Sequence, residues 1–173
     1  MQIIHNAISD ELNEKIVIFI YDALQRPQWV ASQFHWGVGL IRGILGDALS
    51  TNNIPTDLKN QIIDELRPYL PSTRNIDIGL NVWPPLSALN WHNDEKYNYG
   101  ATLYLNNNWY REWGGLFLYE CKKSNQMLGL VPEKNLLVIN DNDEWHAVTP
   151  IATEIEFPRL SVQIFQKSDE ETN

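Results

Sequence analysis

The chain of 173 residues is poor in the side chains that most often bind metals. It has one cysteine, Cys121, and four histidines. A single thiol excludes an intrachain disulfide framework and a cysteine-rich zinc or iron–sulfur site. Basic residues are also few, with 13 Lys and Arg against 22 Asp and Glu and a net charge of −9. We therefore expect no broad nucleic-acid-binding surface, and any metal site must use histidine and carboxylate.

Long apolar runs are missing too. The best N-terminal candidate, residues 16–21, is far shorter than the roughly 20 apolar residues that span a bilayer. Acidic residues precede it, whereas a secretory signal carries positive charge at that place. We expect no membrane association and a cytoplasmic location.

The rest of the composition is that of one globular domain over residues 1–173, with 43 % apolar and 20 % charged residues. Ser9 is a plausible N-cap, and the apolar residues that follow recur at helical spacing. This pattern predicts a helix over about 10–24, which ends before Pro27. A second apolar stripe predicts a helix over about 56–69.

The period of the apolar residues changes near residue 76. Ile76, Ile78, Leu80 and Val82 alternate with other residues, as in a half-buried strand. Turn signals separate further strand candidates at 100–106, 114–120, 127–131, 136–140, 145–150 and 159–166. Helices followed by many short strands predict a mainly β sandwich or small barrel. The helical support would cover about 1–70 and the β core about 75–167, with a frayed tail at 168–173.

One short motif could bind a metal. His92 and Asp94 lie two residues apart, so in extended chain their side chains point to the same face. His146, in another strand-like segment, is the leading candidate for a third ligand. Two histidines and one carboxylate leave three positions of a metal open, which is the facial triad of non-haem Fe(II) oxygenases. Each element alone is weak evidence, because H-x-D occurs by chance and a lone histidine is usually structural.

The last strand candidate adds an arginine to this picture. Leu160, Val162 and Ile164 share one face of it, and Arg159, Ser161, Gln163 and Phe165 share the other. An arginine on an inward face needs an anionic partner, and its guanidinium matches a carboxylate well. A dicarboxylate co-substrate would supply that partner. A surface salt bridge is the simpler alternative.

Five segments in order resemble the catalytic core of the prolyl-hydroxylase-like Fe(II)/2-oxoglutarate dioxygenases. They are WHND (91–94), ATLYLN (101–106), WGGLFLY (113–119), WHAV (145–148) and RLSVQIF (159–165). The resemblance covers roughly residues 75–167. It implies a double-stranded β-helix, which is a jelly-roll or cupin-like fold, supported by N-terminal helices. It also implies Fe(II) as the cofactor, 2-oxoglutarate and O₂ as co-substrates, and ascorbate as a candidate reductant.

The resemblance also assigns the metal site. His92, Asp94 and His146 would be the iron ligands and so the catalytic residues, and Arg159 would pair with the distal carboxylate of 2-oxoglutarate. Related halogenases lack the carboxylate ligand, so the presence of Asp94 favours hydroxylation.

Four further residues become candidates for the co-substrate pocket. Tyr104 falls where the family often places a tyrosine that hydrogen-bonds the distal carboxylate, and Thr102 shares its strand face. Ser161 is a further candidate, two residues after the arginine. Trp83 is the nearest match to a tyrosine that lines this pocket in many prolyl hydroxylases. This difference weakens the transfer of prolyl specificity.

An aromatic loop follows the Tyr104 strand and contains Trp109, Arg111 and Trp113. Packing against the core is the simpler interpretation, and a substrate lip over the iron is the functional alternative.

We expect a hydroxylase of an unactivated C–H bond in a prolyl or other residue of a peptide or protein. A free amino acid or small metabolite as substrate, and a non-catalytic jelly-roll binding module, are the alternatives. The sequence leaves the oligomeric state open.

Overall fold

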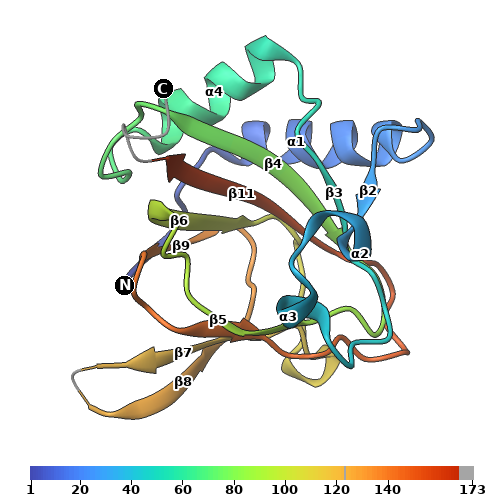
Figure 1. Ribbon diagram of the computed structural model, residues 1–173. Coiled ribbons are helices and arrows are strands. Elements are labelled where there is room, and N and C mark those ends of the chain that lie inside the picture. Colours follow the sequence, from blue (N-terminus) through green and yellow to red (C-terminus); the bar gives the residue numbers. More distant parts are fainter. Residues whose placement is uncertain (123, 168–173) are drawn as a thin grey trace.

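The computed structural model describes residues 1–122 and 124–167 (Figure 1). The predicted frayed tail, 168–173, lies outside this range. Among the helices of the described residues, none combines the length and apolarity needed to cross a membrane. The cytoplasmic location stays a prediction.

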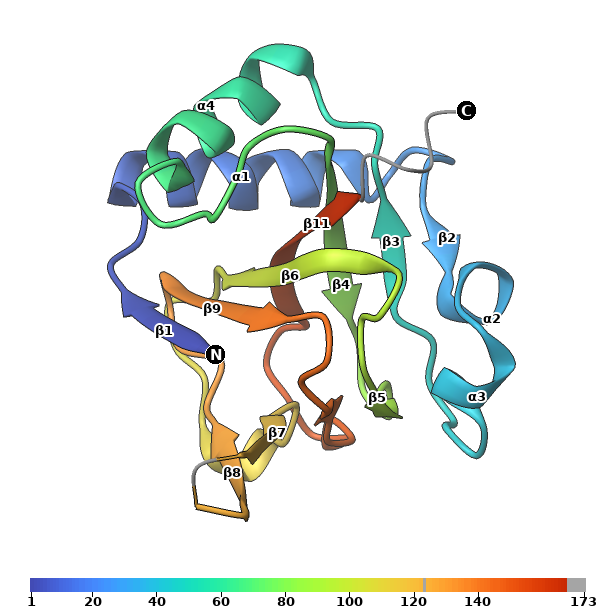
Figure 2. The same cartoon turned by 60° about the vertical axis from the view of Figure 1, so that its left-hand side comes forward.

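Two antiparallel sheets form the β core. The larger has the order β1 (Gln2–His5), β9 (Leu136–Asp141), β6 (Tyr97–Tyr104), β11 (Arg159–Lys167), β4 (Ile76–Trp83), β3 (Leu49–Thr51) and β2 (Val30–Ala31). The smaller has the order β5 (Leu89–His92), β10 (His146–Val148), β7 (Phe117–Cys121) and β8 (Gln126–Leu130). In Figures 1 and 2 the smaller sheet lies below the larger one. This arrangement agrees with the predicted jelly roll.

Two long helices cover the outer face of the larger sheet. They are α1 (Asp10–Ala23) and α4 (Thr56–Leu66), and Figures 1 and 2 show both above the sheet. The Ser9 hydroxyl accepts a hydrogen bond from Leu12 N at 3.2 Å and so caps α1. Apolar side chains of both helices and of the central strands form one buried cluster, among them Ile16, Ile20, Ile62, Leu80, Leu103 and Val162. Its burial fixes which face of each central strand points outward.

The opposite face of the larger sheet points toward the smaller sheet and is more polar. Along β11 the residues alternate as predicted, because Leu160, Val162 and Ile164 belong to the apolar cluster under the helices. In the register, Arg159 lies opposite Trp83 of β4, and Ser161 lies opposite Tyr104 of β6. Three neighbouring strands therefore bring the predicted co-substrate residues together.

Most predicted elements are confirmed within a few residues at their ends. The prediction of helical support over about 1–70 was incomplete, because this region also provides β1, β2 and β3. It also contains the four-residue helices α2 (Ser32–His35) and α3 (Val38–Ile41). Strand β5 was missed as well, and a single 3₁₀ turn, η1 (Arg111–Trp113), interrupts the aromatic loop.

Candidate metal centre and co-substrate pocket

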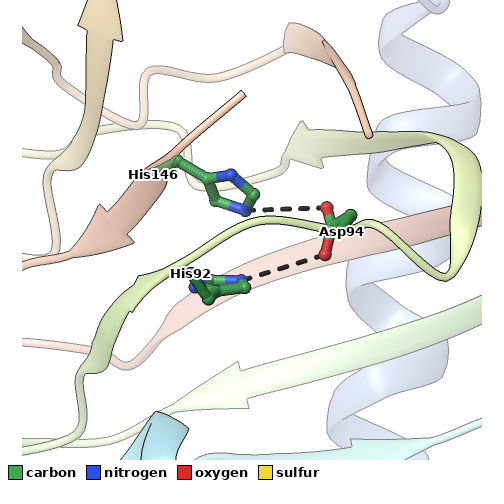
Figure 3. A group of neighbouring side chains, drawn as sticks. All are labelled: His92, Asp94 and His146. Carbon is green, nitrogen blue, oxygen red and sulfur yellow. Dashed lines mark ion pairs between the residues drawn. The ribbon is translucent and has the colours of Figure 1, made fainter. Parts of the chain in front are cut away.

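His92, Asp94 and His146 meet between the two sheets (Figure 3). His92 ends β5 and His146 begins β10, and these two residues are paired in the register. Asp94 lies in the turn that follows β5, where Tyr97 N donates to its carbonyl at 2.8 Å. Its Oδ1 is 3.9 Å from His92 Nε2, and its Oδ2 is 3.6 Å from His146 Nε2. The potential ligand atoms all lie within 4.8 Å of one another, so the three side chains can bind one metal ion.

Backbone carbonyls fix the orientation of both imidazoles. His92 Nδ1 lies 2.8 Å from Asn90 O, and His146 Nδ1 lies 2.8 Å from Glu144 O. A carbonyl only accepts, so each Nδ1 carries the proton and each Nε2 is left with the lone pair that a metal needs. Burial and the neighbouring His146 lower the pKa of His92 and thereby favour its neutral, metal-binding form.

Two residues beside the carboxylate carry no recognisable motif, and the sequence did not reveal them. Asn140 Nδ2 donates to Asp94 Oδ2 at 3.0 Å. Gly100 lies opposite Asn140 in the pairing of β6 with β9. A Cβ atom on Gly100 would stand 2.6 Å from Asp94 Oδ2. An isolated glycine inside a strand was the one available signal, because it often marks a close approach of another group.

Arg159 is buried, and no carboxylate of the described residues pairs with it. Arg159 is 1 % exposed. Its guanidinium carbon lies 4.7 Å from the centre of the Trp83 ring and 4.9 Å from the centre of the Tyr104 ring. Arg159 Nε and Nη1 and the Tyr104 hydroxyl have no hydrogen-bond partner among the described residues. No ion pair of this part of the chain includes Arg159.

The electrostatics of this pocket favour a carboxylate ligand. A buried guanidinium without an anion is unfavourable, and a carboxylate would satisfy its unused donors. Burial lowers the pKa of Arg159 and raises the pKa of Tyr104. The phenol is therefore protonated at neutral pH and able to donate to the same carboxylate. The residues present fit the distal end of a dicarboxylate.

The other predicted pocket residues form side-chain hydrogen bonds across neighbouring strands of the larger sheet. Trp83 Nε1 donates to Ser161 Oγ at 3.3 Å, which orients the indole beside Arg159. Thr102 Oγ1 donates to Gln163 Oε1 at 2.7 Å. On β6, Thr102 lies between Gly100 and Tyr104 and so between the metal centre and the Arg159 pocket.

The aromatic loop packs behind the Arg159 pocket. Trp109 is buried in the same cluster as Trp83, and its Nε1 donates to Gly114 O at 2.8 Å. Trp113 meets Trp109 edge-on at 5.3 Å between ring centres. By contrast, Arg111 is exposed and lies 3.7 Å from Glu112. Trp109 and Trp113 therefore contribute to packing, and the substrate-lip role of this loop stays a prediction.

The sequence model of the 2OG-Fe(II) oxygenase superfamily matches residues 79–167, slightly more than half of the chain. The chain belongs to this superfamily. The matched segment contains His92, Asp94, His146 and Arg159. No curated protein sequence matches the chain.

Solved structures of other 2OG-Fe(II) oxygenases have the same fold. A prolyl-4-hydroxylase from Pseudomonas putida superposes with a TM-score of 0.73 at 16 % identity, over 96 % of this chain and 92 % of that one. A prolyl hydroxylase from Trichoplax adhaerens, in complex with a peptide of hypoxia inducible factor, gives 0.74 at 14 % identity over 98 % and 84 %. The non-haem α-ketoglutarate-dependent epimerase SnoN from nogalamycin biosynthesis gives 0.66 at 12 % identity over 95 % and 76 %.

Membership in the superfamily defines the cofactor chemistry. The protein is a 2-oxoglutarate-dependent dioxygenase that uses Fe(II), 2-oxoglutarate and O₂. The predicted family, the jelly-roll fold and the use of Fe(II), 2-oxoglutarate and O₂ are thereby confirmed, and ascorbate as a reductant stays a prediction.

Proposed function

We propose that this oxygenase hydroxylates an unactivated C–H bond in a prolyl or other residue of a peptide or protein. Two observations carry the proposal: two histidines and one carboxylate that can together bind a metal, and a buried arginine that forms no ion pair with the described residues. The carboxylate ligand leaves no place for a halide, which favours hydroxylation over halogenation. The likeness to two prolyl hydroxylases, one of them in complex with a peptide, supports the substrate class.

In this proposal His92, Asp94 and His146 bind Fe(II) on one face, which leaves three positions for the co-substrates. Bound iron, 2-oxoglutarate and O₂ supply the oxidising chemistry: one oxygen atom enters the substrate, the other enters succinate, and CO₂ leaves. Arg159 and Tyr104 would hold the distal carboxylate, with the Tyr104 hydroxyl donating a hydrogen bond to it. The flanking Trp83 ring keeps water from the guanidinium and so strengthens its attraction to that carboxylate.

A free amino acid or small metabolite is the second candidate substrate. Trp83 favours it, because this residue replaces the expected tyrosine and changes the wall of the pocket. The fold itself also serves SnoN, an epimerase of nogalamycin biosynthesis.

Product analysis separates the two substrate classes. The purified protein is incubated with Fe(II), 2-oxoglutarate, ascorbate and air, first with a library of proline-containing peptides and then with free amino acids. We expect succinate to form in step with a peptide that gains one oxygen atom, and the matched peptide with Pro→Ala to show whether proline is the target. Oxygen incorporation into free amino acids alone would contradict the peptide proposal. His92→Ala should abolish both products.

A further inference from the structure

Two residues outside the His92–Asp94–His146 group lie against the Asp94 carboxylate: Asn140, which donates a hydrogen bond to it, and Gly100, which has no side chain there. Asn140 in β9 is 1 % exposed, and its Nδ2 donates to Asp94 Oδ2 at 3.0 Å. Asp94 itself is 7 % exposed. Asn140 therefore offers a buried carboxylate an amide donor in place of water.

Gly100 provides the space in which this contact forms. It lies opposite Asn140 on the neighbouring strand, and a Cβ atom there would stand 2.6 Å from Asp94 Oδ2 and 3.2 Å from Asn140 Nδ2. Its φ does not lie in the left-handed region, so the backbone alone does not require glycine at this position. The requirement is for room beside the carboxylate.

The hydrogen bond makes the two carboxylate oxygens unequal. In Figure 3 one oxygen is directed toward each imidazole. Oδ2 accepts a hydrogen bond from Asn140, which occupies one of its lone pairs. No side chain of the described residues donates a hydrogen bond to Oδ1. A carboxylate that bound iron through both oxygens would fill one of the three positions left open by the triad. Partners of this kind orient ligands and tune the metal.

We propose that Asn140 is a positioning residue which, in the space left by Gly100, holds Asp94 so that it binds Fe(II) through Oδ1 alone. The inference rests on the proposed role of Asp94 as a ligand. It gives Asn140 and Gly100 the task of preserving an open position for O₂. Loss of the Asn140 amide or of the space at Gly100 should weaken metal binding. It should also uncouple 2-oxoglutarate consumption from substrate oxidation.

Two variants test the inference from different directions. Asn140→Ala removes the donor and leaves the space. Gly100→Ala leaves the donor and fills the space; its methyl group would meet the end of a rotatable side chain, so the carboxylate can turn while the strands stay paired. Asn13→Ala is the matched control, because Asn13 is 2 % exposed and its Nδ2 donates to the backbone at Leu105 O, at 3.2 Å, with no other side-chain hydrogen bond to the described residues.

The measurements are the Kd of Co(II) by calorimetry, the visible d–d spectrum of the Co(II) protein, and the ratio of hydroxylated product to succinate. We expect both site variants to weaken metal binding about 10- to 100-fold, the range typical for such partners, and to change the spectrum. Asn13→Ala should lower the Tm and leave Kd and spectrum as in the wild type. Unaltered Kd, spectrum and coupling in Asn140→Ala would overturn the inference. A wild-type protein that binds no Co(II) or Fe(II) would instead overturn the proposed function.

Discussion

Replacing Arg159 with methionine should make the ligand-free protein more stable and unable to bind 2-oxoglutarate. The guanidinium is buried between Trp83 and Tyr104, with Nε and Nη1 unpaired within the described chain. Methionine keeps much of the volume and its contacts with both rings, but it carries no charge to desolvate. The unpaired guanidinium therefore lowers the stability of the ligand-free protein, and an anionic ligand would offset this cost.

The magnitude follows from two opposing contributions. Replacement of buried ionic groups by well-packed apolar ones often stabilises a protein by about 1–4 kcal/mol. Loss of the two cation–π contacts removes about 0.5–1 kcal/mol each in weak cases and more when they are desolvated. Taking the middle of each range, with the weak case for both contacts, we expect Arg159→Met to raise the free energy of unfolding by about 1 kcal/mol. For a domain of this size that corresponds to a Tm higher by about 2–4 °C.

Thermal unfolding with and without ligand is the assay. A co-substrate at 100 times its Kd stabilises the native wild type by about 2.7 kcal/mol. We expect 2-oxoglutarate with Mn(II) to raise the Tm of the wild type and to give Arg159→Met only the shift caused by the metal. Arg67→Met is the control, because Arg67 is exposed and pairs with Asp64 at 2.8 Å, and it should change stability by less than about 0.5 kcal/mol. A less stable ligand-free Arg159→Met, or one that keeps the full response to 2-oxoglutarate, would refute the reasoning.

Three further predictions concern the pocket, the core and the aromatic loop. Ser161→Ala should leave the buried Trp83 Nε1 without an acceptor, lowering stability in urea by about 1–3 kcal/mol and weakening 2-oxoglutarate binding in calorimetry; an unchanged midpoint would contradict the role of Ser161. Burial raises the pKa of Tyr99 to about 12 from its usual 10, so its contribution to stability is complete below pH 10 and is lost as the pH rises toward 12. Tyr99→Phe should flatten the fall of Tm over that range, and an equally steep fall would argue against it. Arg111→Ala should leave the Kd values of metal and 2-oxoglutarate unchanged, because the side chain is exposed. An unchanged KM for the substrate would then exclude Arg111 from a substrate lip.

Elements with a long, regular apolar pattern could be predicted from the sequence. The helix α1 has a capping serine and a clear period, and β4 and β11 alternate over eight and nine residues. Strands β2, β3 and β5 have only two to four residues, too few to show a period. They form because a longer neighbour provides hydrogen-bonding partners, as Val82 does for Leu49. Such pairing is a property of the assembled sheet.

The candidate site likewise contains residues that could be predicted from the sequence and groups that could not. His92, Asp94, His146 and Arg159 could be named because their residue types and order match known chemistry. The groups that orient them could not. The carbonyls of Asn90 and Glu144 belong to the backbone, which every residue has, and Asn140 reaches Asp94 across 46 positions of sequence. Only the pairing of β6 with β9 brings that amide to the carboxylate.

An anaerobic titration with Fe(II) and 2-oxoglutarate tests the central claim most directly. The claim is that His92, Asp94 and His146 bind Fe(II). Arg159 then holds the distal carboxylate of a 2-oxoglutarate molecule whose other end binds the iron. A visible charge-transfer band should appear only when both ligands are present and should saturate at one of each per chain. His92→Ala should abolish the band, whereas Arg159→Ala should shift its saturation to much higher 2-oxoglutarate with an unchanged Kd for the metal. No band in the wild type, or an unchanged titration in His92→Ala, would contradict the account.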